Sequence, residues 1–209
     1  MNAGYLSLFC VIILLILQWM GWLNPFLSQL RIRPYVFVSL LLTVYAGSGW
    51  VLSLTPHIQV YPVTYALPLV FFFYLWMKEQ EEIRPHLLAG GLLAGATLFL
   101  LRYMLWLDPV LQIGGETYLV ALLAVSLSLL IARTLFHVFI VIGIGVSVME
   151  VILEAWTYER SGYFIVGDLH YRDILVFSLL VSLVSWQVFV SAVGAGFFAV
   201  RKLFARRSR

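Results

Sequence analysis

The chain has few charged residues, a single cysteine and no recognisable catalytic motif. Only 11% of its 209 residues are Asp, Glu, Lys or Arg, whereas soluble domains contain roughly 25%. The lone Cys10 excludes an intramolecular disulfide and a cysteine-based metal site within one chain. Hydrolase, zinc-protease, P-loop and dinucleotide-binding motifs are also absent from the sequence. We therefore predict no catalytic residue, no metal site and no cofactor.

Long apolar runs fill most of the chain. Hydrophobic residues make up 63% of it, and the mean hydropathy is +1.00. A helix needs about 20 apolar residues to cross a bilayer core, with a range of roughly 17–25. We identify seven runs, of which the fifth is short: 4–23, 35–54, 61–77, 87–107, 118–132, 134–156 and 174–200. The sequence therefore predicts an all-α, multi-pass transmembrane helix bundle in one domain, 1–200, followed by a basic tail, 201–209.

Most Lys and Arg residues outside the runs fall on one side of the predicted membrane. Arg160 and Arg172 lie on the other side. The remaining ten occupy alternate connections and the tail: Arg31, Arg33, Lys78, Arg84, Arg133, Arg201, Lys202, Arg206, Arg207 and Arg209. Cytosolic segments carry the excess of Lys and Arg. We therefore expect an N-terminus outside the cell (plasma) membrane and a C-terminus in the cytosol.

Three charges interrupt the apolar runs, and such charges are rare and usually have a purpose. Arg102 lies in the fourth run, and Glu150 and Glu154 lie one helical turn apart in the sixth. At 1.5 Å per residue, Arg102 is about 22 Å and Glu150 about 24 Å from the cytosolic start of its run. The matching depths, in the outer third of the membrane, predict that Arg102 and Glu150 meet.

Small residues share helical faces with these charges. In the fourth run they are Gly91 and Gly95, and in the sixth they are Gly143 and Ser147. Small residues at such spacings let membrane helices approach closely. We therefore predict that the fourth and sixth helices pack against each other through these residues.

Other polar side chains lie at the same outer level and are candidates for the lining of an outward-facing pocket. They come from four other segments: Tyr45, Tyr65, Glu116, Ser178 and Ser182. Ser147 is a further candidate for the pocket lining, and Arg102, Glu150 and Glu154 are the candidates for binding a ligand or an ion. These side chains would make the outer half of the bundle more polar than the inner half.

The intramembrane charges have two interpretations. In the first, the Arg102–Glu150 pair only holds two helices in register, the serines bond to backbone carbonyls, and the tyrosines belong to the interfacial aromatic belt. In the second, the charges bind a ligand or an ion. One arginine cannot neutralise both glutamates, and Glu154 has no evident partner. A carboxyl in that position can relay protons or bind a cation.

The longest polar segment of the sequence is 157–173, which we expect on the outer side. Turn signals at Ser161-Gly162 and Gly167-Asp168 bracket a short apolar stretch. Asp168 and His170 are its candidate functional residues. The segment forms either a short hairpin or an interfacial segment that lies across the helix bundle. It caps the outer pocket or contacts a protein partner, or it is a plain connector with aromatic interface anchors.

Several features resemble the YphA-type membrane proteins of endospore-forming, Bacillus-like bacteria, which are small and uncharacterised. These are the size, the helix count, the Gly-Gly-Glu116 start of a Leu- and Ser-rich helix, and the late acidic helix followed by a Gly–Asp loop. The resemblance spans most of the chain. It implies a bacterial cell membrane, with sporulation as one context, and no known activity or site residue.

Three functional hypotheses follow. The first is a non-enzymatic membrane component that binds a partner or small polar ligand at the outer pocket. The second is a small transporter or channel subunit that uses Glu150 and Glu154 for protons or cations. The third is a membrane-embedded enzyme acting on a lipid-linked substrate.

The expected partners follow from the same features. Membrane lipids are one, since basic tails contact anionic headgroups, and a protein at 157–173 or at the tail is another. A homo-oligomer is compatible with the sequence. Nucleic acid is not expected, because the basic residues are scattered among connections and a short tail.

Overall fold

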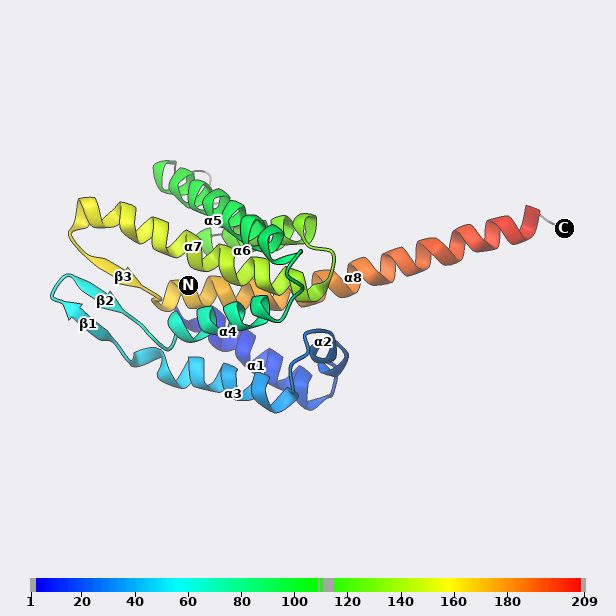
Figure 1. The fold of residues 1–209 in the computed structure, drawn as a ribbon, viewed down its shortest axis with the longest axis horizontal. Coiled ribbons are helices and arrows are strands. Elements are labelled where there is room, and N and C mark those ends of the chain that lie inside the picture. Colours follow the sequence, from blue (N-terminus) through cyan, green and yellow to red (C-terminus); the bar gives the residue numbers. More distant parts are fainter. Residues whose placement is uncertain (1–2, 109, 111–114, 208–209) are drawn as a thin grey trace.

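The computed structural model describes residues 3–108, 110 and 115–207, and it is mostly helical (Figure 1). The first half contains α1 (Tyr5–Trp19), α2 (Asn24–Gln29), α3 (Pro34–Ala46), the 3-10 turn η1 (Gly47–Gly49), β1 (Leu52–Thr55), β2 (Ile58–Val60) and α4 (Ala66–Met77). The second half contains α5 (Arg84–Leu107), α6 (Glu116–Ile131), α7 (Leu135–Ser161), β3 (Phe164–Val166) and α8 (Leu169–Arg207).

Three helices are long and apolar enough to cross a membrane: α5, α7 and the Leu169–Phe189 part of α8. The other apolar helices are shorter: Tyr5–Trp19, Pro34–Gly49, Ala66–Met77 and Glu116–Ile131. By length and composition, the described residues therefore contain three candidate spans, and the prediction of seven holds only in its coarser form, an apolar helical bundle.

The central helix of the bundle is α7. It contacts α2, α4, α5, α6 and α8, and its first half is almost entirely buried. Consecutive long helices run in opposite directions in Figure 1, while α8 extends past the bundle toward the C-terminus. We call the end from which α8 protrudes the tail end.

A three-stranded sheet lies at the opposite end, which we call the sheet end (Figure 1). Strands β1 and β2 form an antiparallel hairpin, and β3 pairs with β2 in parallel, with Ile58 opposite Phe164. The chain leaves β3 through Gly167, whose φ of +81° favours glycine. A Cβ at this position would also lie 2.5 Å from the Cβ of Tyr65.

Helices α5 and α7 make a close contact through glycines. A Cβ on Gly91 would lie 2.7 Å from Ile144, and a Cβ on Gly95 would lie 2.9 Å from the carbonyl oxygen of Gly145. This confirms that the fourth and sixth predicted helices pack together through Gly91 and Gly95. The prediction that Gly143 takes part in this contact is wrong. Gly143 faces α4, where an added Cβ would lie 2.2 Å from the Phe72 ring.

Three predicted boundaries are also wrong. The α-helix does not continue through 47–54, because α3 ends at Ala46, the 3-10 turn η1 follows, and β1 begins at Leu52. Residues 61–65 form turns, so α4 starts only at Ala66. The predicted connector 157–173 is mostly regular structure, since α7 continues to Ser161 and α8 begins at Leu169.

The predicted hairpin or surface segment inside that connector is instead β3, which pairs with a strand distant in sequence. In the basic tail 201–209, α8 continues to Arg207. Residues 208–209 lie outside the described residues.

Candidate functional site

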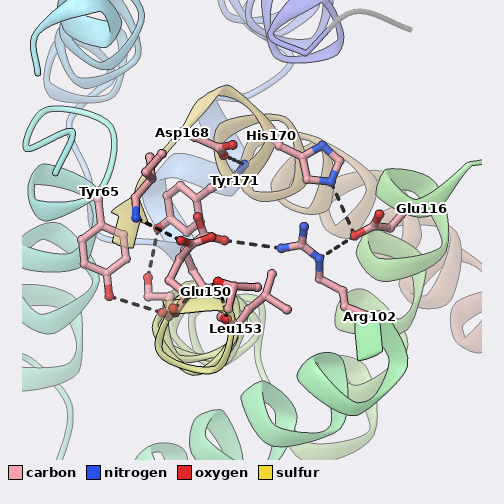
Figure 2. Close-up of polar contacts among 12 residues, drawn as sticks. Tyr65, Arg102, Glu116, Glu150, Leu153, Asp168, His170 and Tyr171 are labelled. Atoms are coloured by element: carbon pink, nitrogen blue, oxygen red, sulfur yellow. Dashed lines mark hydrogen bonds and ion pairs between the residues drawn. The ribbon is translucent and has the colours of Figure 1, made fainter. Parts of the chain in front are cut away.

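Arg102 is the centre of a charged network at the sheet end. Its Nε lies 2.5 Å from Glu116 Oε1, and its Nη1 lies 3.4 Å from Glu150 Oε2. Figure 2 shows the guanidinium between the two carboxylates, and His170 and Arg102 both approach the same oxygen of Glu116. Three helices therefore meet here, since Arg102 comes from α5, Glu116 from α6 and Glu150 from α7. The predicted contact between Arg102 and Glu150 is confirmed.

Glu150 is the most buried member of this network. The residue is 2% exposed, and its carboxylate is also hydrogen-bonded to the backbone of Gly167. A buried carboxylate is costly unless it is paired and hydrogen-bonded. The arginine and the Gly167 amide thus hold Glu150 in place, and through it the turn after β3.

Glu116 has a larger role than the sequence indicated. It is the first residue of α6, its side chain is 29% exposed, and its Oε1 also lies 3.7 Å from His170 Nε2. The sequence placed it in the outer pocket lining but named Glu150 as the partner of Arg102. The closer partner is Glu116, so two carboxylates share one guanidinium.

Glu154 has a partner, contrary to expectation. Its Oε2 accepts a hydrogen bond from the Ile165 amide at 3.0 Å, which ties β3 to the last turns of α7. The contact forms because the chain turns back at Gly162 and β3 lies beside the end of α7, an arrangement that helical periodicity does not predict. The second carboxylate that contacts Arg102, besides Glu150, is therefore Glu116 and not Glu154.

Two tyrosines and a serine pack behind Glu150. The Ser147 hydroxyl lies 3.0 Å from the Tyr171 hydroxyl, and the Tyr65 hydroxyl donates to the Ser147 carbonyl at 3.2 Å. Figure 2 shows Tyr65 and Tyr171 on the same side of Glu150, opposite Arg102. The structure thus brings Ser147 and Tyr65 to the network as predicted, and adds Tyr171, which the sequence analysis missed.

The other predicted pocket residues lie elsewhere. Ser178 and Ser182 are buried, and each donates to a carbonyl of its own helix, at 2.7 and 2.8 Å. Their hydroxyls are therefore satisfied inside α8. Tyr45 belongs to a second charged cluster, where its ring lies 5.1 Å from the Arg172 guanidinium.

That second cluster fixes the start of α1. Asp173 accepts hydrogen bonds from the amides of Gly4 and Ser7, and Arg172 donates to the Ser7 hydroxyl. Both charged residues are 4% exposed. A carboxylate at a helix N-terminus satisfies free amides and complements the helix dipole. These residues therefore join α8 to α1, although the sequence had assigned them to the outer connector.

Asp168 and His170, the connector's candidates, have separate roles. Asp168 Oδ1 accepts a hydrogen bond from the Tyr171 amide at 2.8 Å and caps the start of α8. His170, two residues further on, approaches Glu116. Of the two, His170 is the one in the charged network.

Two cavities flank Glu116. One, of about 440 Å³, lies between α1, α6 and α8 and is lined by Glu116, His170 and Asp173 among others. The other, of about 330 Å³, lies between α5, α6 and α7 and is lined by Glu116, Arg102 and Arg160 among others. Glu150 and Glu154 line neither cavity.

The tail end has its own polar pair. His137 Nε2 lies 3.3 Å from Glu79 Oε2, and cavities of about 270 and 360 Å³ adjoin His137. Within the described residues, neither end of the bundle contains a group of three or more His, Cys, Asp or Glu side chains that would hold a metal ion.

No family model matches the chain, and no curated protein or solved structure is significantly similar to it.

Proposed function

We propose that the protein is a non-enzymatic, multi-pass membrane component that binds a small polar ligand at the sheet end. The position of Glu116 supports this proposal. Glu116 lines both cavities, and its carboxylate is bonded to Arg102 and lies 3.7 Å from His170 Nε2. Ligand sites combine a concave wall with a few fixed polar groups, and these three side chains supply both acceptors and donors.

The proposal includes seven spans, with the sheet end outside the cell. The alternating helix directions support it (Figure 1). So does the chain order, which puts the turns containing Arg31, Lys78 and Arg133 at the tail end, the predicted cytosolic side. The short α4 is compatible with a span, because a bilayer can thin locally around a short helix.

A bacterial cell membrane is the proposed location, on the basis of the YphA-type resemblance. Membrane lipids are the proposed surroundings. A protein partner at 157–173 has less support than a ligand, because most of this segment is committed to α7, β3 and α8.

Ligand binding can be tested by thermal unfolding of the purified protein in a neutral detergent. The probes are amines, amino acids, sugars and phosphate esters, each in large excess. A ligand at 100 times its Kd stabilises the folded state by about 2.7 kcal/mol. We expect at least one class to raise the melting temperature of the wild type but not of Glu116→Gln.

The matched control is Asp108→Asn, which removes an exposed carboxylate at the end of α5. It should respond to the probes as the wild type does. An equal response of Glu116→Gln, or no response of the wild type to any class, would contradict the proposal.

The alternative is a transporter or channel subunit that moves protons or cations through Glu150 and Glu154. It has less support, because Glu150 is 2% exposed and Glu154 is bonded to the Ile165 amide. It predicts that Glu150→Gln abolishes pH- or cation-dependent flux in proteoliposomes, and unchanged flux would exclude it.

A further inference from the structure

The cavity between α5, α6 and α7 has an unusual wall, with two guanidinium groups and three aromatic rings. We call it the arginine cavity. The side chains that matter here are Arg102, Tyr103, Trp106, Glu116, Trp156 and Arg160. Arg102 is paired with Glu116 and Glu150, so the uncompensated charge in this wall is the positive charge of Arg160, which favours an anion.

Arg160 is held in place by aromatic rings rather than by a carboxylate. Its Cζ lies 4.1 Å from the centre of the Trp156 ring and 5.3 Å from the centre of the Trp106 ring. Among the described residues, no Asp or Glu oxygen lies within 4.0 Å of its nitrogens. Stacking covers the faces of a guanidinium and leaves the N–H groups on its edge free to donate.

Arg102 also has a free donor. Its Nε and Nη1 are committed to Glu116 and Glu150, and its Nη2 has no hydrogen-bond partner in the described part of the chain. Both arginines line the same cavity, and each has N–H groups without a partner among the described residues. A guanidinium with a free edge, such as that of Arg160, can donate two parallel hydrogen bonds to a phosphate, and Nη2 of Arg102 adds a further donor.

The cavity lies at the depth of lipid headgroups. The 24 residues of α5 span about 36 Å, against about 30 Å for a bilayer core. Trp106 is one residue from the end of α5, and Trp and Tyr side chains are enriched at the membrane surface. Beside it, Met104 and Leu107 are more than half exposed, which leaves an apolar surface for acyl chains.

We propose that the arginine cavity binds the phosphate group of an anionic amphiphile or phosphate ester, with Arg160 and Arg102 as its donors. This inference rests on the proposed function and specifies the chemistry of its ligand. The phosphate comes either from a phospholipid headgroup or from a soluble phosphate ester, and the two sources share this recognition.

The test measures binding of the first lipid molecule by native mass spectrometry of the purified protein. The probes are phosphatidylglycerol, a diacylglycerol with the same chains but no phosphate, and glycerol phosphate as a soluble competitor. We expect phosphatidylglycerol to bind more tightly than diacylglycerol. Arg160→Gln should weaken phosphatidylglycerol binding about tenfold, the effect of losing one hydrogen bond to a charged group.

Lys78→Gln is the matched control, because Lys78 also lies over an aromatic ring, 4.4 Å from the centre of Tyr74, but at the tail end. It should bind phosphatidylglycerol as the wild type does. If Arg160→Gln lowers the melting temperature, Arg160→Lys is used in its place. The lysine keeps the charge and lacks the paired donors, so phosphatidylglycerol binding should still fall several-fold. Displacement of phosphatidylglycerol by glycerol phosphate would identify a soluble phosphate ester as the source of the phosphate. A lack of displacement would identify a phospholipid as the source.

Equal phosphatidylglycerol binding by the wild type and both Arg160 variants, with no displacement by glycerol phosphate, would overturn the phosphate inference. If another probe class still depends on Glu116 in that case, the proposed function stands. If no class depends on Glu116, both fail.

Discussion

Replacing Arg102 by methionine tests whether the charged network is essential for folding. The Arg102 side chain is 11% exposed and faces two carboxylates, of which Glu150 is 3% exposed at its side chain. Methionine fills similar space without the charge, so Glu150 stays buried without its cation. Breaking a buried ion pair in this way costs about 3–5 kcal/mol. We expect the free energy of unfolding to fall by about that amount.

Replacing Glu150 should lower the free energy of unfolding less than replacing Arg102. In Glu150→Gln, Arg102 keeps Glu116, and the amide can still accept from the guanidinium. The expected loss is about 1.5–3 kcal/mol, the range for a hydrogen bond to a charged group. In the double variant Arg102→Met/Glu150→Gln no uncompensated charge remains at Glu150. The combined loss should therefore be smaller than the sum by about 1–3 kcal/mol, as for other residues in direct contact.

The assay is unfolding by sodium dodecyl sulfate in mixed micelles, followed by far-ultraviolet circular dichroism. Arg33→Met is the control, because Arg33 is exposed at the tail end and its guanidinium contacts the Tyr35 hydroxyl. It should change stability little. Additive losses in the double variant would refute the coupling of Arg102 and Glu150, and a stable Arg102→Met would refute the network's role in folding.

Two further predictions concern packing and the sheet. Gly95→Ala should destabilise the protein by about 1–3 kcal/mol, because the new Cβ would meet the Gly145 backbone. The control Gly49→Ala has open space around it and should unfold like the wild type. Equal stability of the two variants would contradict the close α5–α7 contact. Glu154→Ala should increase hydrogen exchange at the Ile165 amide and leave the bundle folded, and unchanged exchange there would show that the bond does not hold β3.

The Arg102–Glu150 contact could be predicted because it depends on two regular quantities. Helical rise fixed the depth of each charge, and helical period fixed its face. The same reasoning failed for Gly143, because a face about 100° wide borders two neighbouring helices and the period alone does not decide between α4 and α5.

The remaining site contacts depend on distant segments meeting at the sheet end. Glu154 bonds to Ile165 where β3, which pairs with the distant β2, lies beside the end of α7. Glu116 meets Arg102 where α6 packs beside α5. One missed feature had a local signal. Asp168 is a favoured N-cap residue, so α8 could have been started there, with Asp173 inside its first turns.

The most direct test of the account is carbodiimide labelling of carboxylates with a water-soluble amine in sealed membrane vesicles, read by peptide mass spectrometry. In vesicles with the outer face exposed, Glu116 should be modified. Glu81, whose side chain is 91% exposed at the tail end, should react only after permeabilisation, and Glu150 should stay unmodified in both conditions. Modification of Glu150 in the folded protein, or of Glu116 only from the cytosolic face, would contradict the proposed outward-facing site.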